Sequence, residues 1–341
     1  MKKSLIYLFS LLCMLTLATS CSDDDEKGGT DEAWKELSKD YTAENLSIGT
    51  VSTSGTVSVN ATSADKATIA LNNVVAGESS VSVDATLKKT DTGYAFEGES
   101  TATTCNVKVS GTIELGANDK EDKVNISINR TLTSALAGTM ELNFIPSTGE
   151  GLMAQTYAYF NTGNEQMDAM LNGMAAPVLG QLIAQQVESV SVNLGEDGIF
   201  SFSFKKVGSS ETTVMPPANL AAMINSYLTW FEKDDVLYLA VHKDALTILG
   251  GLDILPEGME LESIVNILSL DGDFYTIPVN TIKEDNLVTV FLGKAMLTKV
   301  WALAKPLIEK IPDENLQSIV NVVGGVMDTA QDIKVGLVFK K

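Results

Sequence analysis

Residues suited to nucleophilic or zinc chemistry are scarce in this chain of 341 residues, which contains one histidine and three cysteines. A Ser–His–Asp triad would need His242 as its base, and no Gly-x-Ser-x-Gly elbow supplies the serine. His242 ends an apolar run just before Lys243 and Asp244, so we expect a partly exposed polar role for it. A histidine-rich zinc site is excluded, because such a site needs several histidines.

Paired carboxylates are the remaining catalytic option, because a glycoside hydrolase needs only two of them. Three pairs lie close together in the sequence: Asp234 with Asp235, Asp271 with Asp273, and Glu196 with Asp197. All three lie at expected turns, where aspartate stabilises tight geometry by accepting hydrogen bonds from nearby backbone amides. We therefore expect no enzyme activity and no catalytic residue, with a carboxylate-dependent glycoside hydrolase as the less favoured alternative.

The sequence also gives little sign of a cofactor or a metal. The glycine pairs at 250–251 and 324–325 lack the spacing of a phosphate-binding or dinucleotide loop. Residues 117–122 offer enough oxygens for calcium, but Lys120 and Lys123 lie beside them and no EF-hand spacing is present. We expect no cofactor and no bound metal.

Recognition of glycans or proteins is the first kind of binding that the sequence leaves open. It would use exposed aromatic side chains as stacking platforms, for which Trp34, Trp230 and Tyr238 are candidates. Trp34 lies in a polar segment and is the one we expect to be exposed. Trp230 and Tyr238 lie in apolar runs, where aromatic residues usually belong to the core.

Binding of an apolar small molecule or lipid in the C-terminal half is the alternative. Met167, Met170 and Met174 recur near helical spacing in an apolar stretch. Methionine is flexible and can line an adaptable pocket, although it fills gaps in packed cores more often. The three methionines are therefore candidate ligand-binding residues, with core packing as the competing interpretation.

The N-terminus carries a targeting signal. Lys2 and Lys3 precede an apolar run over residues 5–17 that is too short to span a bilayer, and small residues follow it. This pattern predicts a secretory signal peptide over residues 1–20. Because Cys21 stands at the expected cleavage site, the stretch resembles the lipobox of bacterial lipoproteins. The resemblance implies cleavage before Cys21 and acylation of that cysteine.

An acidic run follows the cysteine. It consists of Ser22, Asp23, Asp24, Asp25 and Glu26. Charges this dense repel one another and predict a disordered tether over residues 21–40. The run is also similar to the export signal of Bacteroidota surface lipoproteins. This similarity implies a lipid anchor in the outer membrane with the protein exposed at the cell surface, and the periplasmic leaflet is the alternative.

Charge and cysteine content narrow the partners further. The formal net charge is −20, which excludes nucleic acid as a partner and disfavours adsorption to anionic lipid. Membrane contact is therefore expected through the N-terminal acyl anchor. With Cys13 in the signal peptide and Cys21 acylated, Cys105 is the single free thiol. We expect Cys105 to be a buried small hydrophobe and no intramolecular disulfide to form.

Two segments with different patterns predict two domains. Residues 41–147 alternate apolar and polar side chains in short runs separated by Gly, Asn and Asp. This pattern predicts an all-β barrel or sandwich with seven or eight strands in an antiparallel meander. Residues 148–341 interleave hairpins with helical segments and show no βαβ repeat, which predicts an α+β domain with a mainly antiparallel sheet. In its first helix, over residues 164–187, Pro177 is expected to cause a kink or a division.

This plan resembles uncharacterised Bacteroidota lipoproteins that combine a calycin-like β domain with an α+β partner, among them the family catalogued as DUF4925. The resemblance rests on the lipobox with its acidic run, on the meander over residues 41–130 and on the layout of the elements. It implies a lipid-anchored protein of the cell envelope, and calycin-like barrels hold small apolar ligands when they are wide enough. It supplies no catalytic residue.

Overall fold

The computed structural model describes residues 32–48, 53–116, 121–147, 149, 151–217, 221, 227–250, 261–308 and 324–341. The chain divides into two units, Met1–Ala33 and Trp34–Lys341. The predicted signal peptide, Cys21 and the acidic run from Ser22 to Glu26 lie outside the described residues. The fold described below is that of the second unit.

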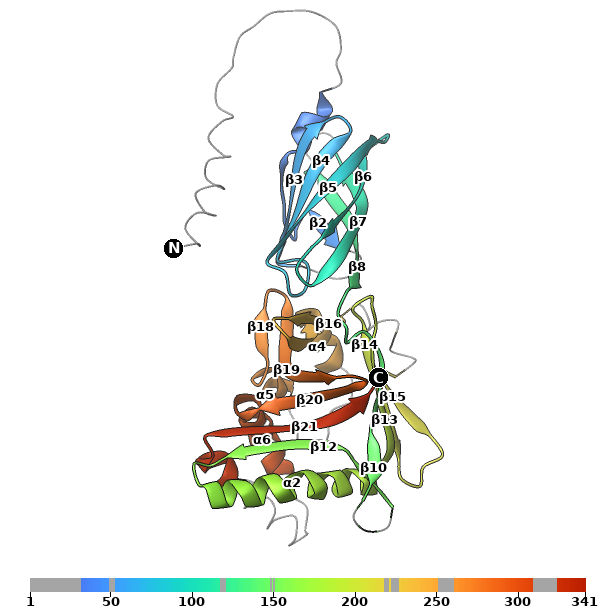
Figure 1. Cartoon of the computed structure of the whole chain (residues 1–341). Helices are drawn as coiled ribbons and strands as arrows, with labels where there is room; N and C mark the ends of the chain where they lie inside the picture. The colour runs from blue at the N-terminus through green and yellow to red at the C-terminus, as the bar shows by residue number, and fades with distance from the viewer. Residues whose placement is uncertain are drawn as a thin grey trace, which may run out of the picture. The chain divides into compact units, whose positions relative to one another are not determined.

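The first sheet has eight strands in the order β1-β3-β4-β5-β6-β7-β8-β2 (Figure 1). A short 3-10 helix, η1 Ala33–Leu37, precedes it with Leu37 buried, so the disordered tether expected over residues 21–40 is corrected from residue 33 onward. The strands are β1 Lys39–Tyr41, β2 Leu46–Ile48, β3 Thr56–Ser63, β4 Lys66–Asn72, β5 Ser80–Lys89, β6 Gly93–Thr101, β7 Cys105–Glu114 and β8 Lys123–Leu132. Strands β3 to β8 form the predicted antiparallel meander, and β2 pairs with β8 in parallel.

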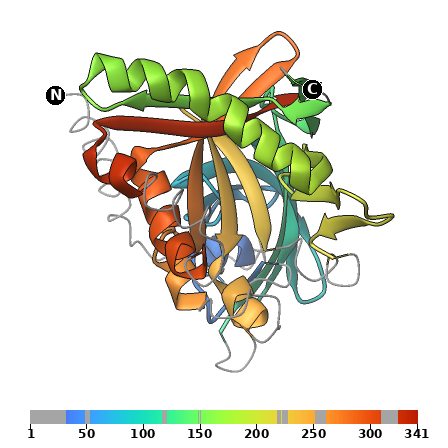
Figure 2. The same cartoon turned by 90° about the horizontal axis from the view of Figure 1, so that it is seen from below.

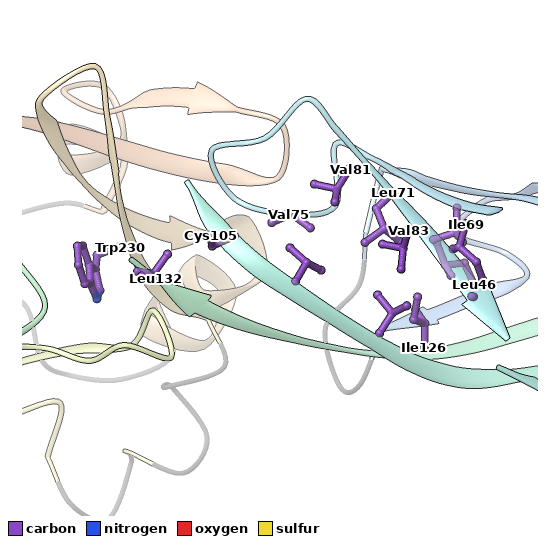
Figure 3. Close-up of a cluster of buried hydrophobic side chains, with 14 of the residues drawn as sticks. Leu46, Ile69, Leu71, Val75, Val81, Val83, Cys105, Ile126, Leu132 and Trp230 are labelled. Atoms are coloured by element: carbon purple, nitrogen blue, oxygen red, sulfur yellow. The ribbon is translucent and has the colours of Figure 1, made fainter. Parts of the chain in front are cut away.

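Strict alternation in the sequence builds the interior of this sheet. Along β5 every second side chain from Val81 to Leu87 is buried, so a slip of one residue would expose the whole set. Figure 3 shows Ile69 and Leu71 of β4 and Val83 of β5 side by side in the interior, where each is fully buried. Cys105 is buried as expected, and its burial raises the pKa of the thiol. The thiolate, which is the reactive form, is therefore disfavoured.

The second sheet has eleven antiparallel strands in the order β15-β14-β13-β9-β21-β20-β19-β17-β16, with β12 paired to β21 and β18 paired to β19. Its strands are β9 Gly138–Leu142, β12 Thr156–Asn161, β13 Val187–Leu194, β14 Phe200–Lys206, β15 Thr212–Met215, β16 Leu228–Lys233, β17 Val236–His242, β18 Ser269–Asp271, β19 Phe274–Glu284, β20 Leu287–Gly293 and β21 Asp332–Lys340. A separate pair is formed by β10 Phe144–Pro146 and β11 Leu152–Ala154. The predicted hairpins and the mainly antiparallel character are confirmed.

Helices accompany the second sheet. They are α2 Glu165–Gln186, α4 Lys243–Gly250, α5 Leu261–Val265 and α6 Lys294–Ile308, with a further helical stretch at 324–329. Pro177 lies inside α2, which is one helix from Glu165 to Gln186, so the expected alternative of a division at Pro177 is corrected. The sequence also predicts a helix over residues 313–330, and most of it lies outside the described residues. Of the helices that the structure describes, none is both long and apolar enough to cross a membrane.

The two sheets share one hydrophobic core. Its buried residues include Ile69 and Leu132 from the first sheet, and Trp230 and Val288 from the second. Strand β9 was expected in the all-β segment 41–147, but it pairs with β13 and β21 of the second sheet. The change from one sheet to the other therefore lies between β8 and β9. Alternation predicts a strand, but it does not indicate which sheet the strand joins.

Candidate apolar binding site

An apolar cavity of about 380 Å³ lies on the second sheet beside α2 and α6. Figure 1 and Figure 2 show α2, in light green, lying beside β12 at the edge of the second sheet, with β21, in dark red, as the next strand. The wall residues are Thr156, Leu179, Ile183, Val279, Val290, Phe291, Leu292, Leu297, Val335, Gly336 and Leu337. None of them carries a titratable side chain.

Paired side chains of β20 and β21 form the floor of the cavity, and the register of the two strands brings them together. Residues two apart in a strand share a face. Val290 and Leu292 of β20 lie directly opposite Leu337 and Val335 of β21, which gives a compact group of four aliphatic side chains. Between them lies Gly336, where a Cβ would come within 2.2 Å of the Val290 carbonyl oxygen. The missing side chain lets β20 and β21 approach closely at this point.

The helices contribute the walls. Leu179 and Ile183 lie four residues apart on the inward face of α2, and Leu297 comes from the first turns of α6. The side chains from both helices, like most of those from the sheet, are only partly buried, so a ligand could reach them. The single polar side chain in the lining, Thr156, already donates a hydrogen bond to the Ala176 carbonyl at 2.6 Å. The cavity therefore offers apolar contact and no charge.

Side-chain hydrogen bonds fix α2 against β12. Asn172 accepts from the Phe160 N–H at 2.7 Å and donates to the Phe160 carbonyl at 3.0 Å, so it pairs with the strand as a neighbouring strand would. Asp168 accepts from the backbone N–H of Thr162 at 2.6 Å and from its hydroxyl at 2.7 Å. At Gly180 the helix comes so close that a Cβ would lie 2.3 Å from the Ala154 carbonyl oxygen. These contacts hold the cavity wall in place.

We expect Asn172→Ala to lower the free energy of unfolding by about 1–3 kcal/mol, because it leaves both backbone groups of Phe160 without their partner. Urea unfolding followed by circular dichroism measures the change. The matched control is Gln181→Ala, which removes an amide from an exposed position of the same helix. Equal midpoints for the two variants would contradict the role given to Asn172.

The three candidate methionines do not line this cavity. Met167, Met170 and Met174 lie on the solvent side of α2 and are 43%, 54% and 60% exposed. The expectation of a pocket lined by these residues is therefore corrected, and Leu179 and Ile183 on the inward side of the helix take that place. Helical spacing correctly placed the methionines on one face, but both faces of α2 are apolar, so spacing could not show which one packs inward.

The candidate aromatic residues are not open platforms. Trp230 is fully buried, and its indole N–H donates to the Gly195 carbonyl at 2.8 Å. Tyr238 is half-buried and stacks on Phe231 with 5.0 Å between the ring centroids. Trp34, expected to be exposed, is half-buried against the shared core. The interpretation of Trp230 and Tyr238 as packing residues therefore agrees with their positions.

His242 is buried, contrary to the expected partial exposure, since only 2% of it is exposed. Its Nδ1 accepts a hydrogen bond from the Asp244 backbone N–H at 3.2 Å, and its ring meets Phe274 edge-on with 5.2 Å between centroids. Although His242 lies at the end of a strand, its ring is buried because it packs against aromatic rings. In the described part of the chain, no three His, Cys, Asp or Glu side chains are grouped to hold a metal ion.

The predicted turn role fits Asp234, Asp235 and Asp197, whereas the carboxylate of Asp273 binds residues distant in the sequence instead of nearby backbone amides. Asp234 and Asp235 adopt positive φ values of 53° and 60° in the β16–β17 turn. Asp273 is buried and accepts hydrogen bonds from Thr53, Ser54 and Lys243, which occupy its carboxylate. Asp197 accepts from the Ile199 N–H at 2.9 Å within its own turn.

Sequence reasoning missed the residues that form the cavity. The available signal was the apolar character of β20 and β21, but any buried strand shows the same character. Comparison with known proteins finds no family model, no curated protein and no solved structure that matches this chain. The resemblance to the DUF4925 lipoproteins therefore stays a prediction. A function for this protein has to be inferred from the geometry of the cavity.

Proposed function

We propose that this protein binds an apolar small molecule or an acyl chain in the cavity between α2, α6 and the second sheet. The observation that carries the proposal is the lining, in which the side chains are aliphatic or aromatic apart from one threonine whose hydroxyl donates within the wall. The volume of about 380 Å³ lies in the lower part of the range of small-molecule sites.

The chemistry of the lining defines the ligand class. Each methylene moved from water into such a site contributes about 0.8 kcal/mol, so a chain of several methylenes binds appreciably. An ionised group inside the cavity would lose its hydration without gaining a partner. The ligand we propose is therefore a long aliphatic or neutral lipid-like molecule, with any charged head group left outside in water.

An anchored lipoprotein would meet such ligands in its own surroundings. Acylation at Cys21 and an outer-membrane, surface-exposed position remain part of the proposal, with the periplasmic leaflet as the alternative. Recognition of glycans or proteins receives less support, because Trp230 is buried and Trp34 and Tyr238 are half-buried. The proposed activity is binding without chemistry, and it assigns no role to a metal, a cofactor or nucleic acid.

A variant with a larger side chain in the cavity lining tests the proposal. We expect Ile183→Trp to weaken binding of a fluorescent long-chain fatty acid by at least about tenfold, because the indole would occupy the space meant for the chain. Leu182→Trp is the matched control, since this neighbouring residue is 41% exposed and does not line the cavity. Fluorescence titration gives both dissociation constants, and circular dichroism confirms that both variants fold. Equal affinities for the two variants, or no binding by the wild type, would overturn the proposal.

A further inference from the structure

A row of five apolar side chains runs along the solvent side of α2. It consists of Met167, Met170, Met174, Val178 and Leu182, and we call it the α2 ridge. Its members recur every three or four residues and therefore share one face of the helix. Each is between 41% and 60% exposed. A contiguous apolar surface of this kind marks a contact site in soluble proteins.

The ridge lies on a helix without the usual polar outer face. A surface helix normally carries charged residues opposite its packed face. In α2, residues 169–186 contain no charged side chain, although 20% of the whole chain is charged. The two acidic residues of the helix, Glu165 and Asp168, both lie in its first turn. Most of the length of α2 is therefore apolar or uncharged on both sides.

The other side of the same helix is the wall of the cavity. Leu179 and Ile183 line the cavity, while Val178 and Leu182, their direct neighbours in sequence, belong to the ridge. One helix thus separates the proposed ligand site from the α2 ridge. A ligand that leaves a membrane beside this helix would have a short path to the cavity.

We propose that the α2 ridge rests on a lipid bilayer without net negative charge, and that the apolar ligand of the cavity is exchanged there. The ligand-exchange part of this proposal rests on the proposed function, in which the cavity binds an apolar ligand. It gives the protein a second membrane contact, formed by the folded unit and independent of acylation at Cys21.

The size and charge of the ridge favour a bilayer over a second copy of the chain. Five half-exposed side chains present on the order of 300 Å² of apolar surface, by the relation between side-chain burial and area. A stable protein interface needs about 800 Å² from each partner. Two copies would also repel each other through their net charge of −20. A bilayer requires no matching protein surface, and binding to it increases with the apolar area inserted.

Charge also selects the kind of lipid. The helix has no lysine or arginine to attract anionic head groups, and its only charges are negative. The chain as a whole is acidic, so an anionic surface would repel it. A zwitterionic lipid such as phosphatidylcholine fits both facts. Unbranched, flexible methionine side chains also adapt readily to fluid acyl chains.

Vesicle co-sedimentation tests the assignment. The protein used is the chain from Ser22 onward, which contains the whole compact unit Trp34–Lys341 and lacks the cysteine that would be acylated. With phosphatidylcholine vesicles, we expect the double variant Met170→Glu and Met174→Glu to bind at least about tenfold more weakly than the wild type. The control Leu270→Glu changes a residue of β18 that is 60% exposed, as Met174 is, and it should bind within about twofold of the wild type.

Titration with the fluorescent fatty acid in solution separates the two proposals. We expect the double variant to bind the fluorescent fatty acid with wild-type affinity and to bind vesicles more weakly than the wild type does. A wild type that binds the probe but not the vesicles overturns the ridge assignment alone. A wild type that binds vesicles but no probe overturns ligand exchange together with the proposed function.

Sedimentation velocity and vesicle composition complete the test. A monomeric wild type agrees with a bilayer as the partner. A dimer that the double variant dissociates would assign the ridge to a second copy and overturn the bilayer. Tighter binding to anionic than to zwitterionic vesicles would overturn the choice of lipid.

Discussion

Replacement of Trp230 by alanine should lower the free energy of unfolding by about 3–5 kcal/mol, which is a large share of the stability of a typical domain. Trp230 is fully buried in the core that the two sheets share. Its indole N–H donates to Gly195 and its backbone N–H donates to Gly198 at 2.9 Å, so it holds the β13–β14 turn against β16. The alanine variant would leave a cavity and remove one of the two hydrogen bonds that the Gly195 carbonyl accepts, the other coming from the Gly198 N–H at 2.9 Å.

Guanidinium unfolding followed by far-ultraviolet circular dichroism measures this loss. The variant Trp230→Phe keeps a ring but no indole N–H and should lose less, about 1–3 kcal/mol, so it gives a reading even if the alanine variant does not fold. Trp34→Ala is the control at a half-buried position and should be milder than Trp230→Ala. Equal losses in the free energy of unfolding for Trp230→Ala and Trp34→Ala would contradict the larger contribution to stability that we assign to Trp230.

Stability at acid pH should depend on Asp273. This buried carboxylate accepts from the Thr53 hydroxyl at 2.9 Å, the Ser54 N–H at 2.7 Å and the Lys243 ammonium at 2.6 Å, so it joins the loop before β3 to the second sheet. Burial by itself would raise the pKa of Asp273, but these hydrogen bonds outweigh it and lower the pKa from 3.8 to about 2. The ionised form is therefore bound more strongly in the folded protein than in the unfolded chain.

The sign of the pH effect follows from this depressed pKa. The stabilisation is complete above the unfolded pKa of about 4 and is lost as the pH falls through the folded value of about 2. The difference corresponds to about 2 kcal/mol. We expect Asp273→Asn to remove this part of the pH dependence and to lower stability at neutral pH by about 2–4 kcal/mol, because Lys243 and the Thr53–Ser54 loop lose their carboxylate.

Urea unfolding of both proteins between pH 2 and pH 7 makes the comparison. The gap between wild type and Asp273→Asn should be widest at neutral pH and should narrow below pH 4. Asp271→Asn, two residues earlier and exposed, is the matched control and should follow the wild-type curve. A constant gap across this range would show that the carboxylate of Asp273 is not the titrating group.

Local patterns in the sequence were sufficient for the elements themselves. Alternation from Ser80 to Leu87 predicts most of β5, which extends to Lys89, and the turn Gly195–Gly198 predicts the hairpin of β13 and β14. The apolar stretch ending near Val187 predicted α2. These predictions depend on residues close together in the chain, where backbone geometry fixes which side chains share a face.

Contacts between distant residues were not predictable in this way. Asp273 meets Thr53 across 220 positions, and the lining of the cavity comes from α2, α6 and four strands. Whether β9 continues the first sheet or joins the second depends on its neighbours in space, and its own sequence suits both. His242 was expected to be partly exposed because Lys243 and Asp244 follow it, but the fold places it among aromatic rings.

The sequence by itself determined the acidic character and most of the strands and helices, because these depend on composition and on short-range periodicity. It also determined that Met167, Met170 and Met174 lie on one face of a helix. Only the tertiary structure decided that this face is exposed and that Leu179 and Ile183 line the cavity. The physical reason is that α2 is apolar on both sides. The hydrogen bonds that Asn172 accepts from Phe160 of β12 and that Asp168 accepts from Thr162, just after β12, select the side that packs inward.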